Sequence, residues 1–204
     1  MAEASFFIIF SLAIVGMLSS AKAGDPDITS DFILPSTATV SSSYFLYTGL
    51  RAVFNSSAPR ATLKASKASM AEFPALAGQS VSMAVLQFPP GAVNPPHVNS
   101  RASGILFVVR GSLEVGLVDT SNKLYTQTLH LGDVFVFPKG LVHFQYNADA
   151  RNPATGVAAF GSASSGTFSI PTSVFEAGIS DGILAESFKT DAATIRKLRA
   201  GLYV

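Results

Sequence analysis

Three histidines are the side chains of this 204-residue chain best suited to acid–base or metal chemistry, and two of them follow turns. His97 comes after the run Gly-Ala-Val-Asn-Pro-Pro, and His143 comes after Pro-Lys-Gly-Leu-Val. Glycine and proline mark turns and stiffen the chain, so each imidazole is expected at the mouth of a strand with a fixed direction. Two imidazoles that converge inside a barrel would suit a divalent cation, although a single histidine is more often structural. His130 lies within an alternating strand and is expected to be a structural or surface residue.

Short segments with a period of two surround these histidines and indicate β-strands. The predicted strands are 80–87, 105–109, 113–117, 125–131, 134–137, 143–146 and 157–160. Turns rich in Gly, Pro, Asn and Asp separate them, and residues 91–96 are predicted to be a stiff loop. Six or seven short strands at this spacing favour an antiparallel sandwich or barrel.

The first 23 residues are predicted to be a secretory signal peptide that is cleaved after Ala23. Residues 4–18 are almost wholly apolar but too short to span a bilayer comfortably, and Ala-Lys-Ala at 21–23 forms a cleavage pattern. The alternative is a membrane anchor. Cleavage removes Lys22 and Glu3, so the 14 basic and 13 acidic residues each fall by one and the net charge stays +1. This balance gives no reason to expect nucleic acid or an anionic membrane as a partner.

Residues 24–61 are rich in Ser, Thr, Pro and Asp and show no sustained period, which predicts an extended, loop-rich arm. The sequon Asn-Ser-Ser lies in this arm, and Asn55 is therefore the candidate N-glycosylation site. The aromatic residues that we expect to pack the arm onto the barrel are Tyr44, Phe45 and Tyr47.

The tail of the chain changes to helical spacing. The predicted helices are 171–178, with Thr172 or Ser173 as N-cap, then 181–188 and 191–202. The predicted organisation is thus a signal peptide (1–23), an extended arm (24–61), a β-barrel (62–170) and C-terminal helices (171–204).

The chain has no cysteine, which excludes disulfides, thiol catalysis and zinc–thiolate sites. Its stability must come from the core and from contacts between subunits. The sequence also lacks a P-loop, a G-x-S-x-G elbow, an H-E-x-x-H helix and a dinucleotide-binding glycine motif.

Two boxes around the histidines resemble those of the plant germin-like branch of the cupins. The first box normally reads G-x5-H-x-H-x3–4-E-x6-G, and the corresponding residues here are Gly91, His97, Asn99, Gly104 and Gly111. The second box is matched at every defined position by Gly132, Pro138, Gly140, His143 and Asn147. The resemblance covers essentially the whole chain after residue 23.

This resemblance implies an all-β fold, a single cupin jelly-roll β-barrel with short C-terminal α-helices. In typical members three His and one Glu hold manganese in the barrel, which supports oxalate oxidase activity in true germins and superoxide dismutase activity in some relatives. The resemblance also implies a hexamer, built as a trimer of dimers, in the plant apoplast or cell wall. The N-terminal Cys pair of typical members is missing, so packing alone would hold the arm.

The sequence departs from the family pattern at the metal-binding positions. Asn99 stands at the second His position and Gly104 at the Glu position, so His97 and His143 alone remain of the four usual ligands. An amide is a weaker ligand than a carboxylate, and glycine has no side chain to offer. The candidate ligands are therefore His97, His143 and Asn99, a set that disfavours manganese and suits Cu²⁺ or Zn²⁺ better. No residue is assigned a catalytic role.

Three hypotheses for function follow. The lost ligands favour a secreted apoplastic germin-like protein without oxalate oxidase activity, with a role in plant defence or the cell wall. The second hypothesis is a metal-dependent oxidoreductase, with superoxide dismutase favoured over oxalate oxidase. The third is a cupin that binds a small molecule in the barrel, which Gly104 in place of Glu would enlarge. All three assume a homo-oligomer with no nucleic-acid partner and, after signal cleavage, no membrane partner.

Overall fold

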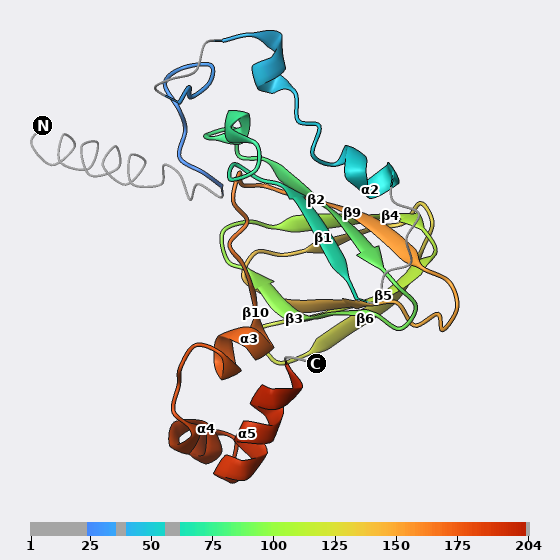
Figure 1. Ribbon diagram of the computed structural model, residues 1–204, viewed down its shortest axis with the longest axis vertical. Coiled ribbons are helices and arrows are strands. Elements are labelled where there is room, and N and C mark those ends of the chain that lie inside the picture. Colours follow the sequence, from blue (N-terminus) through green and yellow to red (C-terminus); the bar gives the residue numbers. More distant parts are fainter. Residues whose placement is uncertain (1–23, 36–39, 56–61, 203–204) are drawn as a thin grey trace, which may run out of the picture.

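The computed structural model describes residues 24–35, 40–55 and 62–202, and in these ranges two antiparallel sheets face each other as a barrel (Figure 1). The predicted signal peptide and its cleavage site at Ala23 lie outside the described residues, as does the side chain of Asn55. The N-terminal arm lies at one end of the long axis, and the C-terminal helices lie at the other.

The chain passes repeatedly from one sheet to the other. The first sheet contains, in spatial order, β1 (Lys64–Ala68), β2 (Ser82–Phe88), β9 (Ala154–Phe160), β4 (Gly104–Arg110) and β7 (Val134–Phe137). The second contains β10 (Thr167–Ser169), β3 (Val93–Asn99), β8 (Val142–Tyr146), β5 (Ser112–Val118) and β6 (Leu124–His130). Neighbouring strands in each sheet are mostly distant in sequence, as in a jelly roll, so the predicted all-β barrel is confirmed.

Alternate residues of each strand fill the space between the sheets. On β4, Gly104, Leu106 and Val108 are buried, whereas Ile105 and Phe107 between them are exposed on the outer face. This is the period of two that a pleated strand imposes. The Val108 end of β4 packs in the hydrophobic core, and the Gly104 end lines a cavity. Each fully buried Leu or Phe of the core contributes about 1.5–3 kcal/mol to stability.

Three strands were not predicted or were placed wrongly. β3 begins at Val93, so the predicted stiff loop at 91–96 is largely strand, and its pairing with β8 shifts register between Asn94 and His97. Pro95 and Pro96 have no N–H to donate, which explains a bulge at this point. β1 and β10 lack strong alternation and are held by their neighbours β2 and β3.

Within the arm that the sequence predicts to be extended and loop-rich, the structure contains two short helical turns. These are η1 (Ser42–Phe45) and α2 (Arg51–Asn55), while a third, η2 (Pro74–Leu76), lies between β1 and β2. Of the three aromatic residues expected to pack on the barrel, Tyr47 does so by stacking on Phe73, with ring centroids 5.4 Å apart. Tyr44 and Phe45 instead contact each other within the arm, and half of Phe45 remains exposed.

Hydrogen bonds as well as packing fix the arm, so the expectation of packing alone was wrong. The carboxylate of Asp25 accepts from the buried Ser162 Oγ (2.5 Å) and from the backbone N–H of Ala163 (2.7 Å). Further along, Gln79 Nε2 donates to the carbonyl of Asp31 (3.1 Å). The start of the described chain is thereby tied to the loop after β9.

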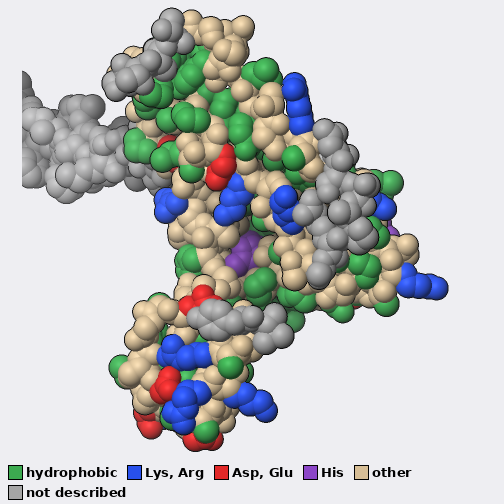
Figure 2. All heavy atoms as spheres, viewed as in Figure 1, with side chains coloured by type: hydrophobic (Ala, Val, Ile, Leu, Met, Phe, Trp, Pro, Cys, Tyr) green, Lys and Arg blue, Asp and Glu red, His purple; other side chains and the backbone are tan. Residues whose placement is uncertain are grey.

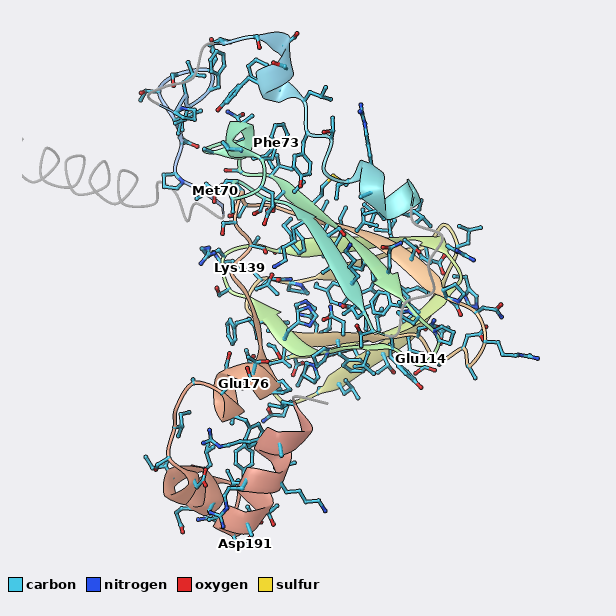
Figure 3. All side chains as sticks on the ribbon, in the orientation of Figure 1. Met70, Phe73, Glu114, Lys139, Glu176 and Asp191 are labelled. Carbon is cyan, nitrogen blue, oxygen red and sulfur yellow. The ribbon has the colours of Figure 1, made fainter. Side chains whose placement is uncertain are left out.

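Three helices, α3 (Ile170–Phe175), α4 (Asp181–Ser187) and α5 (Ala192–Gly201), project from the barrel, with Asp191 at the far tip (Figure 3). The N-cap of α3 is Ser169, whose hydroxyl accepts from Thr172 N, rather than the predicted Thr172 or Ser173. Proline is favoured in the first helical turn, so Pro171 belongs inside the helix and not before it. Among the described residues, no helix has the length and apolar character needed to cross a membrane.

Candidate functional site

His97 and His143 form a cross-strand pair inside the barrel. They lie directly opposite each other on β3 and β8, and their ring centroids are 4.1 Å apart. Only 7% of His97 and 1% of His143 is exposed. The structure therefore brings together the two histidines that the sequence singled out, whereas His130 is exposed on β6.

The turns that precede the two histidines fix the orientation of their rings. His97 Nδ1 lies 2.8 Å from the carbonyl of Pro95 in the bulge, and His143 Nδ1 lies 2.8 Å from the carbonyl of Leu141. A carbonyl oxygen can only accept, so each Nδ1 carries the hydrogen and each Nε2 of the neutral ring keeps a lone pair. The Leu141 turn depends on Gly140, whose φ of 80° favours glycine. Gly140 N–H also donates to the Asn99 carbonyl (3.1 Å).

Asn99 uses both ends of its amide within the protein. It lies two residues after His97 on β3, and it faces Thr167 of β10. Its Oδ1 accepts from Thr167 Oγ1 (2.6 Å), and its Nδ2 donates to His143 Nε2 (3.2 Å). The reverse amide orientation would require hydrogens on both nitrogens of His143, that is, a buried charged ring. The lone pair of His143 that would face a metal is therefore bound to Asn99.

The space beside Gly104 is occupied by an aromatic ring. Gly104 on β4 pairs with Phe160 on β9, so their side-chain positions lie on the same face of the sheet. A Cβ added to Gly104 would lie only 3.1 and 3.2 Å from two ring carbons of Phe160. A larger side chain at position 104 can enter the barrel only if the Phe160 ring moves.

Burial keeps both imidazoles uncharged. It lowers the pKa of His143 to about 4, an effect increased by the neighbouring His97 and opposed by the hydrogen bond to the Leu141 carbonyl. Burial also lowers the pKa of His97, against the opposing hydrogen bond to the Pro95 carbonyl. Charged forms lose hydration in such a site, which is the physical reason for both shifts.

Acidic side chains lie away from this site. Glu114 is exposed on the outer face of β5 (Figure 3), and Asp133 is exposed in the turn after β6, where its Oδ2 accepts from His130 N–H (2.8 Å). In the ranges that the structure describes, no three His, Asp or Glu side chains gather as a metal-binding group. Neither carboxylate therefore replaces the one that Gly104 lacks.

A cavity of about 220 Å³ opens beside the histidine pair. Figure 2 shows histidine side chains at the bottom of a hollow in the middle of this face. The polar residues of its wall include Asn94, His97, Asn99, His143 and Gln145, and its apolar residues include Met83, Leu106, Phe137, Ala158 and Phe160.

Four residues of this site were not predicted from the sequence, namely Asn94, Gln145, Phe160 and Thr167. Gln145 could have been found because it lies two residues after His143 on the same strand face, and it pairs with Asn94 through a 2.6 Å hydrogen bond. Thr167 and Phe160 carried no such local signal, because each reaches the site through pairing with a strand far away in the sequence.

The donor set does not fit a manganese ion. Mn²⁺ prefers carboxylate, carbonyl and water oxygens, but no carboxylate of the described residues lines the cavity. The amide oxygen of Asn99 accepts from Thr167, and the imidazole of His143 accepts from Asn99. Of the three predicted ligands, His97 is the one that keeps a ligating atom, Nε2, without a partner among the described residues.

Comparisons with known proteins agree with the fold and with the sequence boxes. A family model described as Cupin matches residues 55–196. Putative germin-like protein 9-2 of Oryza sativa subsp. japonica is 53% identical over 190 residues, covering 91% of this chain and 88% of the relative. Germin-like protein 9-3 of the same organism is 48% identical over 206 residues, covering 97% of this chain and 96% of the relative.

Solved structures of related proteins have the same fold. Recombinant oxalate oxidase in complex with glycolate superposes with a TM-score of 0.76 at 29% identity, covering 87% of this chain and 97% of that one. Peruvianin-I, described as a cysteine peptidase from Thevetia peruviana latex, superposes with a TM-score of 0.65 at 27% identity, covering 72% and 98%. Thiol chemistry cannot carry over from the latter, because the present chain has no cysteine.

Proposed function

This chain belongs to the cupin family and to its germin-like branch, and we propose that it is a member without manganese-dependent oxidase activity whose barrel binds a ligand. The observation that carries the proposal is the hydrogen bond from Asn99 Nδ2 to the Nε2 lone pair of His143 (3.2 Å). A metal would have to displace this bond and leave the amide hydrogens of Asn99 without a partner in a buried site. An unsatisfied buried donor costs about 1–3 kcal/mol.

The Gly104–Phe160 pair supports the same proposal. Replacement of the family's carboxylate by glycine removes the negative charge that would balance a divalent cation. The Phe160 ring occupies the space beside Gly104, and one of its carbons lies 3.1 Å from the position that a Cβ at residue 104 would take. Oxalate oxidase chemistry needs a metal held in more than one oxidation state, and this neutral, partly apolar wall offers no ligand that favours the higher state.

We also infer a secreted homo-oligomer of the apoplast, with a role in plant defence or the cell wall. Secretion is supported by the predicted signal peptide, and the resemblance to germins implies a hexamer built as a trimer of dimers. The outer face of the first sheet is apolar, since Ile105, Phe107, Val134 and Val136 are 47%, 42%, 58% and 55% exposed. Such a continuous patch is suited to contact with another subunit. Native mass spectrometry of the secreted protein measures the subunit number.

A metal-dependent oxidoreductase, such as a superoxide dismutase, is the second candidate. One observation favours it: His97 Nε2 has a lone pair, lines the cavity and has no protein partner among the described residues. A copper or zinc ion could bind there with water as additional ligand.

Metal content measured by elemental mass spectrometry separates the two candidates. The protein is secreted from a plant host, and wild type is compared with His97→Ala/His143→Ala. We expect less than about one tenth of a metal ion per subunit in both proteins. A metal ion held in a complete site binds strongly and would remain bound during purification, so a low content means that the site does not hold one. A matched positive control, Asn99→His/Gly104→Glu/Phe160→Ala, restores the family's donor types and opens the space beside position 104.

The comparison between these proteins decides the result. Metal gain in the triple variant with a nearly metal-free wild type would support the proposal. Near-stoichiometric metal in wild type that disappears in the double variant would overturn it and favour the oxidoreductase.

A further inference from the structure

The polar wall of the cavity presents one free acceptor and one free donor. His97 Nε2 keeps a lone pair because Nδ1 donates to Pro95, and it has no partner among the described residues. Gln145 Oε1 accepts from Asn94 Nδ2 (2.6 Å), which leaves the Nε2 hydrogens of Gln145 without a partner in the same ranges. Both residues line the cavity. A hydroxyl group can donate to His97 and accept from Gln145.

The remainder of the wall is apolar and partly aromatic. Phe160 covers Gly104, and Phe137 stacks on His143 with centroids 4.4 Å apart and an interplanar angle of 23°. Leu106 and Ala158 also line the cavity. Aromatic rings pack well against such walls in offset or edge-to-face arrangements.

The volume of the cavity matches a substituted benzene ring. An apolar protein cavity of about 150 Å³ is large enough to bind benzene. The 220 Å³ found here would therefore hold a benzene ring with one or two small substituents.

The charges of the wall favour a neutral ligand over an ionic one. Among the described residues no carboxylate lines the cavity to balance a cation, and the lining residue Lys67 is exposed to solvent, which screens its charge. An anionic oxygen brought next to the Nε2 lone pair of His97 would be repelled. Burial of an unpaired charge is strongly unfavourable, so a neutral ligand is preferred.

We propose that this cavity binds a neutral arene that carries a hydroxyl group, that is, a small phenol. The hydroxyl lies between His97 and Gln145, and the ring lies against Phe160, Leu106 and Ala158. This inference rests on the proposed function, because it requires the cavity to be free of metal.

Isothermal titration calorimetry on the secreted, oligomeric protein tests the inference with three probes of similar size. These are 4-methylphenol, toluene and 4-methylbenzoate. We expect measurable binding of 4-methylphenol, about tenfold weaker binding of toluene because the hydroxyl contacts are lost, and no binding of the carboxylate.

Two substitutions locate the binding site, and a third serves as control. Ala158→Leu fills the cavity and should abolish binding, whereas Ala148→Leu, at an exposed position in the loop after β8, should leave it unchanged. His97→Phe removes the acceptor without altering the fold strongly. It should weaken 4-methylphenol about tenfold and leave toluene unaffected. Circular dichroism shows whether each variant is folded. If Ala158→Leu does not fold, the His97→Phe variant still decides the test.

The outcomes separate this inference from the proposed function. Absence of arene binding to a folded, metal-free protein would overturn the inference and leave the proposed function intact. Equal affinity for 4-methylphenol and toluene, or tighter binding of 4-methylbenzoate, would likewise overturn it. Near-stoichiometric metal in the wild-type protein would instead remove the proposed function on which the inference rests.

Discussion

Acidification is expected to destabilise the protein through His143. The ring is almost completely buried and its Nε2 accepts from Asn99, so protonation would place an uncompensated charge in the barrel. Burial and the neighbouring His97 lower the pKa to about 4. The folded chain therefore binds a proton at this site less readily than the unfolded chain does, and stability must fall as the pH falls.

The magnitude follows from the two pKa values. The ordinary value is 6.5 and the folded value is about 4, so the contribution of His143 is complete above about pH 6.5 and decreases towards about pH 4. Linkage between these values predicts a loss of about 2 kcal/mol between about pH 7.5 and about pH 5, and of about 3 kcal/mol at lower pH. His97 has a pKa lowered in the same direction and adds to this loss.

Urea unfolding at one fixed protein concentration measures the effect across this pH range. His143→Gln removes the titrating group. Between about pH 7.5 and about pH 5, the free energy of unfolding of this variant should therefore fall by about 2 kcal/mol less than that of the wild type. His130→Gln serves as the control for replacement of an exposed histidine, because that residue lies on β6 away from the barrel interior. Equal pH dependence in wild type and His143→Gln would refute the reasoning, and so would a wild type that gains stability on acidification.

Two further substitutions test how the barrel and arm are held. Asp25→Ala removes the carboxylate that accepts from the Ala163 N–H, and we expect a loss of about 2 kcal/mol in urea unfolding, against little change for the exposed Asp31→Ala. Gly156→Ala places a Cβ 2.6 Å from Leu106 Cδ1 in the core, and we expect about 1–3 kcal/mol of destabilisation by the same measurement. An unchanged urea midpoint in either of these two variants would contradict the contact on which its prediction depends.

The sequence was sufficient for the fold class and for the meeting of His97 and His143. Both histidines follow turns whose proline and glycine residues restrict the backbone, and the two family boxes place those turns at adjacent strands. The N-cap of α3 was missed because Ser169 lies before Pro171, in a segment that also forms the end of β10. Local sequence rules therefore predicted turns correctly, but they failed for Ser169, which is both the last residue of a strand and the N-cap of a helix.

The remainder of the site could not be predicted because it depends on strand register. Thr167 reaches Asn99 only because β10 pairs with β3, and the two residues are 68 positions apart. Phe160 meets Gly104 only through the pairing of β9 with β4. Short strands such as β10 have weak patterns of their own, and their register is set by neighbours that a single sequence does not reveal.

The two departures from the family pattern, Asn99 and Gly104, are each accommodated by residues elsewhere in the chain. The amide at position 99 is satisfied by Thr167 and His143 together, and the space at position 104 is filled by Phe160. Gly104→Glu alone would therefore push a carboxylate against the Phe160 ring. Because substitutions at neighbouring positions do not act additively, we expect the combined change at positions 99, 104 and 160 to raise metal content more than the single changes do together.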